Sequence, residues 1–431
     1  MTQQRYELQR ALGTAFGVAV GVGTMIGVGI LRRPGEIAKL LGEPWAIYAI
    51  WLAGALYSFL GALCVAELAT MIPRAGAFTV YARQALGPTA GFAVGWTDWL
   101  LNSASLAYGT IAVAELIPRF WPRTGGWTVP AALLLVASLA FVQYKGIGAN
   151  SLAQQSLSLL VFLVFAGLIA ACFLHAPASA SSGGGAAGAG LWLLAFRSIL
   201  VSYDGWYQPA YFTEENRDPG RGLPRALFGG LATVTAVYLL INAALLHIFP
   251  VATLAASAMP VSDAARLVAG QSGDAVIALL SSCALLSMAN ASLAGGARIL
   301  LGATRALPGW DGITEVRNTG TPWAATMATE LTAAAMIVSG AFDTLLNLAG
   351  VLLVVLYSSA YISLVVLRRR EPAAPRPFRT PAYSVVTGVL LVSGAAFLCG
   401  IAMEDGRTFL AAIACIGVSF LLLVARRYTR Q

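Results

Sequence analysis

The chain has 431 residues, of which 58% are hydrophobic and only 11% are charged. A soluble domain carries about 25% charged residues, so this composition excludes a soluble globular protein and indicates an integral membrane protein. The formal net charge is +8, but the basic residues lie in short segments between apolar runs. That pattern is typical of membrane orientation and speaks against a nucleic-acid partner.

Apolar runs follow one another along the chain, each about long enough for a helix to cross a hydrocarbon core of roughly 30 Å. We predict an all-α membrane protein whose lipid-embedded domain takes up residues 1–431, with about twelve transmembrane helices. The expected spans are 11–31, 45–70, 89–117, 128–145, 152–174, 191–213, 225–249, 273–301, 322–340, 343–367, 382–402 and 408–425. With the N-terminus inside, eighteen of the 27 Lys and Arg residues fall in cytoplasmic segments and seven in outer ones. This asymmetry predicts that both termini are cytoplasmic.

The first span contains GVGTMIGVGI (21–30), which has four glycines in nine positions. Small residues at such spacing allow close helix packing. The alternative is local unwinding at Gly27, Val28 and Gly29, which would leave backbone N–H groups free at the start of a half-helix. Such donors, aided by the helix dipole, suit a substrate carboxylate.

A run of glycine, serine and alanine at 177–190 predicts a flexible linker between two blocks of spans. The first block is 11–174 and the second is 191–367, and two additional helices follow in 382–425. Each block begins with an irregular span. Interruptions at corresponding positions of two halves point to an inverted-repeat transporter.

The second irregular span, 191–213, carries Asp204-Gly205 and Pro209 at its centre. Lipid offers no hydrogen-bonding partner, so a break there requires a polar cavity or protein partners. An acid within a span is a candidate functional residue. Unwinding would expose the carbonyls of Val201, Ser202 and Tyr203 to a substrate ammonium group. Asp204 could cap the second half-helix, shape the ammonium site or carry a proton.

Other candidates for the site depend on which way their side chains face. Tyr203 and Trp206 either form the walls of a pocket or pack as ordinary helix aromatics. Asp98 in the third span either snorkels or faces a cavity, and is a second candidate for coupling. Ser281 and Ser282 offer hydroxyls to a sodium ion, although hydroxyls in membrane helices usually bond to their own backbone.

The chain lacks the residues of a catalytic or metal centre. Its two histidines lie at span ends, and its five cysteines lie in apolar runs without metal-type spacing. We expect no enzyme activity, metal or cofactor.

Several segments, in the right order, resemble the amino acid–polyamine–organocation superfamily, and within it the L-type and related bacterial amino acid permeases. YDGWYQPAYFTEENRDPGRGLPRA (203–226) resembles the sixth span of that family and its following loop. Further similar segments are GTMIGVGI (23–30), AELATMIPRAGAFTVYARQALGP (66–88), NASLAGGARILLGATRALP (290–308) and LRRREPAAPRPFRTP (367–381).

The resemblance implies a five-plus-five inverted repeat with broken helices 1 and 6 and two extra helices. It also implies alternating access to a site for a zwitterionic amino acid. Carried over to this chain, the substrate carboxylate would meet the N–H groups of Gly27, Val28 and Gly29. The ammonium group would meet the carbonyls of Met25, Val201 and Ser202, with Asp204 adjacent.

We therefore expect a secondary amino acid transporter, a proton-coupled symporter or an exchanger, in a bacterial inner membrane. A polyamine or organic cation transporter and a non-transporting sensor are the alternatives, and the oligomeric state is left open. One departure from the family concerns span five, where many relatives carry a lysine at a cation-site position. The only lysines here are Lys39 and Lys145, so no fixed positive charge replaces a coupling ion in that span.

Overall fold

The computed structural model describes residues 8–27, 29–120, 126–178, 188–305, 310 and 312–428. Val28 of the first irregular span lies outside these residues, and so does 179–187 of the expected linker. All the regular secondary structure within the described residues is helical, which agrees with the predicted fold class.

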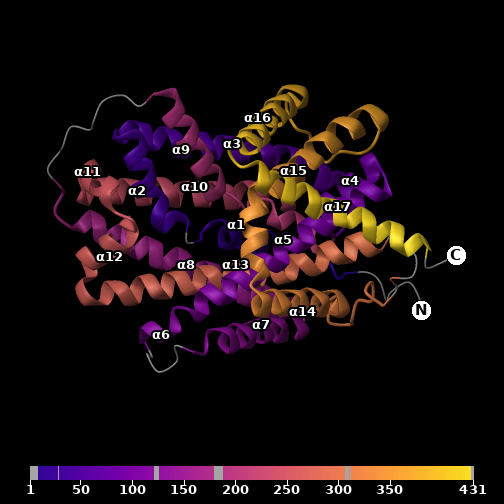
Figure 1. The fold of residues 1–431 in the computed structure, drawn as a ribbon, viewed down its shortest axis with the longest axis horizontal. Coiled ribbons are helices and arrows are strands. Elements are labelled where there is room, and N and C mark those ends of the chain that lie inside the picture. Colours follow the sequence, from indigo (N-terminus) through magenta and orange to yellow (C-terminus); the bar gives the residue numbers. More distant parts are fainter. Residues whose placement is uncertain are drawn as a thin grey trace.

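The helices follow one another along the chain (Figure 1). The α-helices are α1 (Thr14–Met25), α2 (Gly29–Leu41), α3 (Pro44–Met71), α4 (Phe78–Leu86), α5 (Pro88–Ala114), α6 (Ile117–Phe120), α7 (Thr128–Tyr144), α8 (Ile147–Leu174), α9 (Ala189–Ser202), α10 (Gly222–Ile248), α11 (Val251–Ala256), α12 (Pro260–Ala269), α13 (Gly273–Thr304), α14 (Trp323–Ser339), α15 (Ala341–Arg370), α16 (Tyr383–Glu404) and α17 (Gly406–Tyr428). Two 3-10 helices, η3 (Gln208–Glu215) and η4 (Gly270–Ser272), complete the set.

Six helical stretches in the described part of the chain are long and apolar enough to cross a membrane, and the bent pair α1 and α2 makes a seventh. Three more apolar helices are shorter: α7, α9 and Gly406–Phe420 of α17. The chain is thus an integral membrane protein built from helices. The total of twelve spans and the inverted repeat stay predictions.

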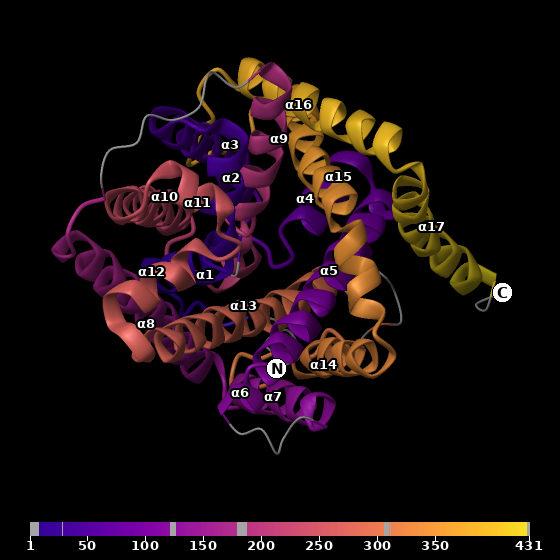
Figure 2. The same ribbon diagram turned by 60° about the vertical axis from the view of Figure 1, so that its left-hand side comes forward.

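Helix α1 lies inside the bundle, where α8, α10 and α13 pack around it (Figure 2). Helices α5 and α13 pack against each other, and α16 and α17 lie along one edge. Close packing explains part of the glycine pattern in α1, because a Cβ at Gly17 would lie 2.5 Å from Ala226 Cβ. Gly27 differs, since a Cβ there would meet no atom within 4 Å. The early glycines therefore serve packing, whereas Gly27 borders open space.

Both irregular spans are interrupted where the sequence predicts. Helix α1 ends at Met25, α2 begins at Gly29, and the two are bent by 53° relative to each other. Helix α9 ends at Ser202 and is followed by turns. The segment after these turns is a 3-10 helix that starts at Gln208, with Pro209 in its first turn. The expected second half-helix of this span is thus 3-10 rather than α-helical.

Candidate functional site

The break between α1 and α2 touches the turn after α9. Thr24 Oγ1 donates to Gly205 O at 3.0 Å. Gly205 has φ +98°, and a Cβ there would lie 2.9 Å from Thr24 Cβ and 3.0 Å from Thr24 C. Only glycine combines a positive φ with so close an approach of two backbones. The Asp204-Gly205 sequence thus lets the two interrupted spans meet.

A single tyrosine joins the two helix ends. The Tyr238 hydroxyl of α10 lies 2.7 Å from Met25 O and 2.8 Å from Ser202 O. Its ring is fully buried and packs edge-on against Trp51 and Tyr203. A phenol carries one proton, so it satisfies only one of the two carbonyls at a time. The other carbonyl keeps an unused acceptor inside the protein.

Met25 and Ser202 are two of the predicted ammonium acceptors, and the structure brings their carbonyls together. Val201 O accepts from Asp204 N at 3.3 Å, while the Val201 side chain is exposed. Ser202 Oγ would lie 3.9 Å from a Cβ at Gly29, so that glycine also borders the α9 end. Of the predicted residues, Met25, Gly29 and Ser202 therefore lie together where the two breaks meet. Val28 lies outside the described residues.

Asp204 accepts a hydrogen bond from the Tyr357 hydroxyl of α15. The N-cap position of η3 is Tyr207 rather than Asp204. The Asp204 carboxylate also accepts a hydrogen bond from the backbone of Gly205, so a capping role in the turn itself stays a prediction. Tyr203 and Trp206 are both buried in this conformation. The Tyr203 hydroxyl donates to the Trp51 carbonyl at 3.2 Å.

Asp98 faces the interior, not the membrane surface. Its Oδ1 accepts from the Tyr211 hydroxyl of η3 at 2.6 Å and from Asn102 Nδ2 at 3.1 Å. Its Oδ2 is buried with no hydrogen-bond partner among the described residues. Because an unpartnered carboxylate oxygen is costly to bury, Asp98 is a site where a proton would be stabilising.

Three tyrosines connect the two acids. Tyr357 contacts Asp204, Tyr211 contacts Asp98, and Tyr207 packs against both tyrosines, with ring centroids 5.3 Å from Tyr357 and 5.8 Å from Tyr211. Both candidate coupling acids thus belong to one buried polar group.

Neutral side chains link span five to α1. Ser158 Oγ donates to Ala19 O at 2.7 Å, and Gln154 Nε2 donates to Ser287 Oγ of α13 at 2.8 Å. A Cβ at Gly23 would lie 2.0 Å from Ser287 Oγ, so this group packs directly on α1. Ser281 and Ser282 precede Ser287 in α13, and by helical rise they lie about 9 and 7.5 Å from it along the helix axis. Ser287 is therefore the serine that meets α1, and a coupling role for the earlier pair stays a prediction.

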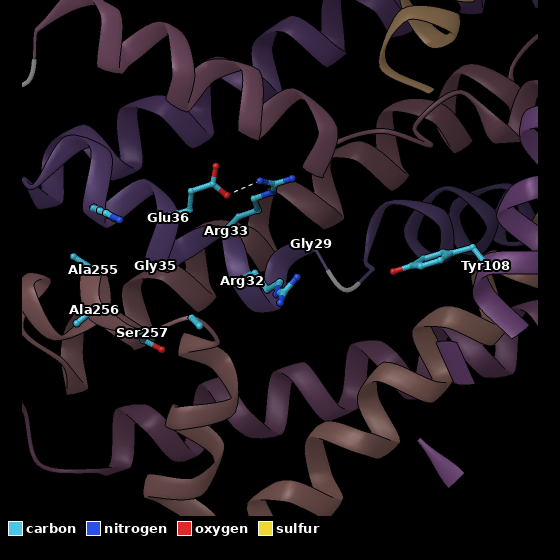
Figure 3. Close-up of a pocket in the computed structure, with 11 residues that line it drawn as sticks. Gly29, Arg32, Arg33, Gly35, Glu36, Tyr108, Ala255, Ala256 and Ser257 are labelled. Carbon is cyan, nitrogen blue, oxygen red and sulfur yellow. Dashed lines mark hydrogen bonds and ion pairs between the residues drawn. The ribbon is translucent and has the colours of Figure 1, made fainter. Parts of the chain in front are cut away.

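Ion pairs close the predicted cytoplasmic side. Arg298 of α13 binds Glu215 through two hydrogen bonds of 2.7 and 2.9 Å, and Arg305 binds Glu214. The Leu12 amide donates to Glu215 O, which fixes the segment before α1. In Glu214, burial alone would raise the carboxyl pKa, but the hydrogen bond and charge of Arg305, together with backbone donors such as the Ala75 amide at 2.9 Å, outweigh it, so the pKa is lowered. On the other side, a cavity opens beside Gly29 (Figure 3).

Sequence reasoning missed Tyr238, Tyr357, Gln154 and Ser287. Each is a polar residue within a largely apolar helix, and no motif distinguishes it from other polar residues nearby, such as Gln155 beside Gln154. Only the fold shows which helix each one faces.

The fold and the two converging breaks define a helical membrane permease. A family model described as "Amino acid permease" matches residues 12–421. The chain therefore belongs to the amino acid permease family, and the resemblance to the amino acid–polyamine–organocation superfamily is confirmed. It is a transporter rather than an enzyme, and its general function is amino acid transport.

Individual relatives are similar over most of the chain. The serine/threonine exchanger SteT of Bacillus subtilis (strain 168) is 25% identical, with 91% of both chains covered. The large neutral amino acids transporter small subunit 2 of Oryctolagus cuniculus is 27% identical, with 86% of this chain and 72% of that protein covered. The b(0,+)-type amino acid transporter 1 of Mus musculus is 28% identical, with 94% and 85% covered.

Proposed function

We propose that the protein is a secondary active transporter that binds a zwitterionic amino acid between its two breaks and works by alternating access. The observation that carries this proposal is the pair of carbonyls, Met25 O and Ser202 O, facing a single Tyr238 hydroxyl. An ammonium group has three N–H donors and could satisfy the carbonyl that Tyr238 leaves free. The backbone N–H groups near Gly27, Val28 and Gly29 would then bind the carboxylate, because free N–H donors at a helix N-terminus and the helix dipole both favour an anion.

The alternating-access part of the proposal rests on the asymmetry between the two sides. The Arg298–Glu215 and Arg305–Glu214 pairs hold the predicted cytoplasmic side together. The cavity beside Gly29 lies on the predicted outer side. Transport would require these ion pairs to separate while the cavity closes. We place the protein in a bacterial inner membrane with both termini in the cytoplasm.

Protons are the coupling ion that we propose. Asp204 and Asp98 are connected through Tyr357, Tyr207 and Tyr211, and such a chain of hydroxyls between two acids supports proton movement better than binding of a metal ion. Exchange without net proton movement is the alternative that the experiment must separate.

The test is transport by purified protein in liposomes. We expect uptake of a labelled neutral amino acid that is stimulated either by an inward proton gradient or by amino acid loaded inside. Empty liposomes are the control. Spermidine and putrescine are then added as competitors, because strong inhibition by these amines without inhibition by amino acids would favour the organic cation alternative. Absence of any amino acid uptake or exchange by folded protein would overturn the proposal.

A further inference from the structure

A cavity of about 620 Å³ lies beside the first break (Figure 3). One wall is α2 from Gly29 to Lys39, the second is Tyr108 of α5, and the third is 255–258 at the end of α11. This volume is in the range of small-molecule sites. Because Gly29 forms part of the wall, the cavity adjoins the site where the two spans meet.

The charge of this cavity is positive. Its lining includes Arg32, Arg33 and Lys39 but a single acid, Glu36. Glu36 is already engaged, since Arg33 lies 2.5 Å from one of its oxygens and Ser198 Oγ donates to the other at 2.7 Å. Among the described residues, Arg32 and Lys39 have no ion-pair partner. Two positive charges therefore remain uncompensated.

The uncompensated charges have donors suited to a carboxylate. A guanidinium presents paired N–H groups that match the two oxygens of a carboxylate. In Figure 3 the Tyr108 hydroxyl points across the cavity toward Arg32, so it supplies a further donor from the opposite wall. The cavity thus has donors on two sides. Glu115 and Asp343 lie close enough to Tyr108 to act on it electrostatically, but neither acid lines the cavity.

We propose that this cavity is an outer vestibule that binds amino acids with a second carboxylate, for which Arg32 is the main ligand and Lys39 adds charge. This inference rests on the proposed amino acid transport. A net anion is attracted by two uncompensated cations, a zwitterion carries cancelling charges, and a cationic amino acid is repelled. The vestibule therefore ranks substrates by net charge before they reach the breaks.

The experiment measures binding of aspartate and of alanine to purified protein by isothermal titration calorimetry at low salt. Wild type is compared with Arg32→Gln and Lys39→Gln. The control is Arg266→Gln, because Arg266 is also exposed but pairs with Asp274 and Asp263 and does not line the cavity. We expect Arg32→Gln to weaken aspartate binding about two- to fivefold, the effect of one exposed charge pair, and to leave alanine binding unchanged. The difference should disappear at about 1 M salt, where the Debye length is about 3 Å.

The inference is overturned if wild type does not bind aspartate, if Arg32→Gln leaves aspartate binding unchanged, or if both ligands weaken equally. Uptake of labelled alanine into liposomes is measured in parallel on the same preparations. Absence of alanine uptake by wild type would contradict the proposed transport function. The aspartate titrations would still test, independently, whether the cavity binds a second carboxylate.

Discussion

Replacing Arg298 by methionine is expected to destabilise the protein strongly. The exposed fractions of the Arg298 and Glu215 side chains are 1% and 0%, and two hydrogen bonds of 2.7 and 2.9 Å join them. Arg298→Met leaves the Glu215 carboxylate buried and unpaired, which costs about 3–5 kcal/mol of unfolding free energy. Glu215→Leu leaves the guanidinium in the same position and should cost a similar amount.

The double variant Arg298→Met/Glu215→Leu separates the ion pair from simple packing. Both buried charges are then gone, so we expect it to be more stable than either single variant, within about 2 kcal/mol of wild type. Unfolding is measured by circular dichroism in mixed micelles with increasing sodium dodecyl sulfate. The control is the exposed pair Arg266 and Asp274, where the same cycle should give no measurable coupling. Additive losses in the buried cycle would refute the reasoning.

Three further predictions concern the polar groups inside the bundle. Tyr238→Phe removes the hydroxyl shared by Met25 O and Ser202 O and should lower the unfolding free energy by about 1–3 kcal/mol. Thermal unfolding measures this loss, and bound amino acid should restore part of it. Asp204→Asn should reduce uptake and flatten its dependence on pH, and an unchanged pH profile would exclude a proton role for this acid. Gln154→Leu removes the amide that donates to Ser287 and should lower the unfolding midpoint by the equivalent of about 1–3 kcal/mol; Gln155→Leu, on the half-buried neighbouring position, is the control and should have a smaller effect.

The positions of the two breaks could be predicted from the sequence because the residues that cause them are local. Gly27 and Gly29 interrupt an apolar span, and Asp204-Gly205 does the same in the sixth. Glycines or an acid in the middle of an apolar span weaken the helix and leave polar groups that lipid cannot satisfy, so their presence indicates an interrupted backbone. The structure adds that Gly205 contacts Thr24, which no local pattern indicates.

The partners of the breaks could not be predicted, because they depend on how distant helices rotate and pack. Tyr238 lies 213 residues from Met25 in sequence, and its apolar neighbours give no periodic signal. Tyr357 beside Asp204 is a similar case. The helical form of the second half of span six also depends on context, since Pro209 in the first turn is compatible with either an α- or a 3-10 helix.

The central claim is that the amino acid binds where the two breaks meet, and binding to Gly205→Ala tests it most directly. A Cβ at Gly205 would displace Thr24 and the end of α1. Gly340→Ala is the matched control, because Gly340 also has a positive φ, +73°, but no atom lies within 4 Å of its Cβ. The ligand is the amino acid that wild type transports, measured by isothermal titration calorimetry. We expect Gly205→Ala to weaken binding at least about tenfold, equivalent to 1.4 kcal/mol, while Gly340→Ala binds like wild type. Equal binding by both variants and wild type would contradict the account.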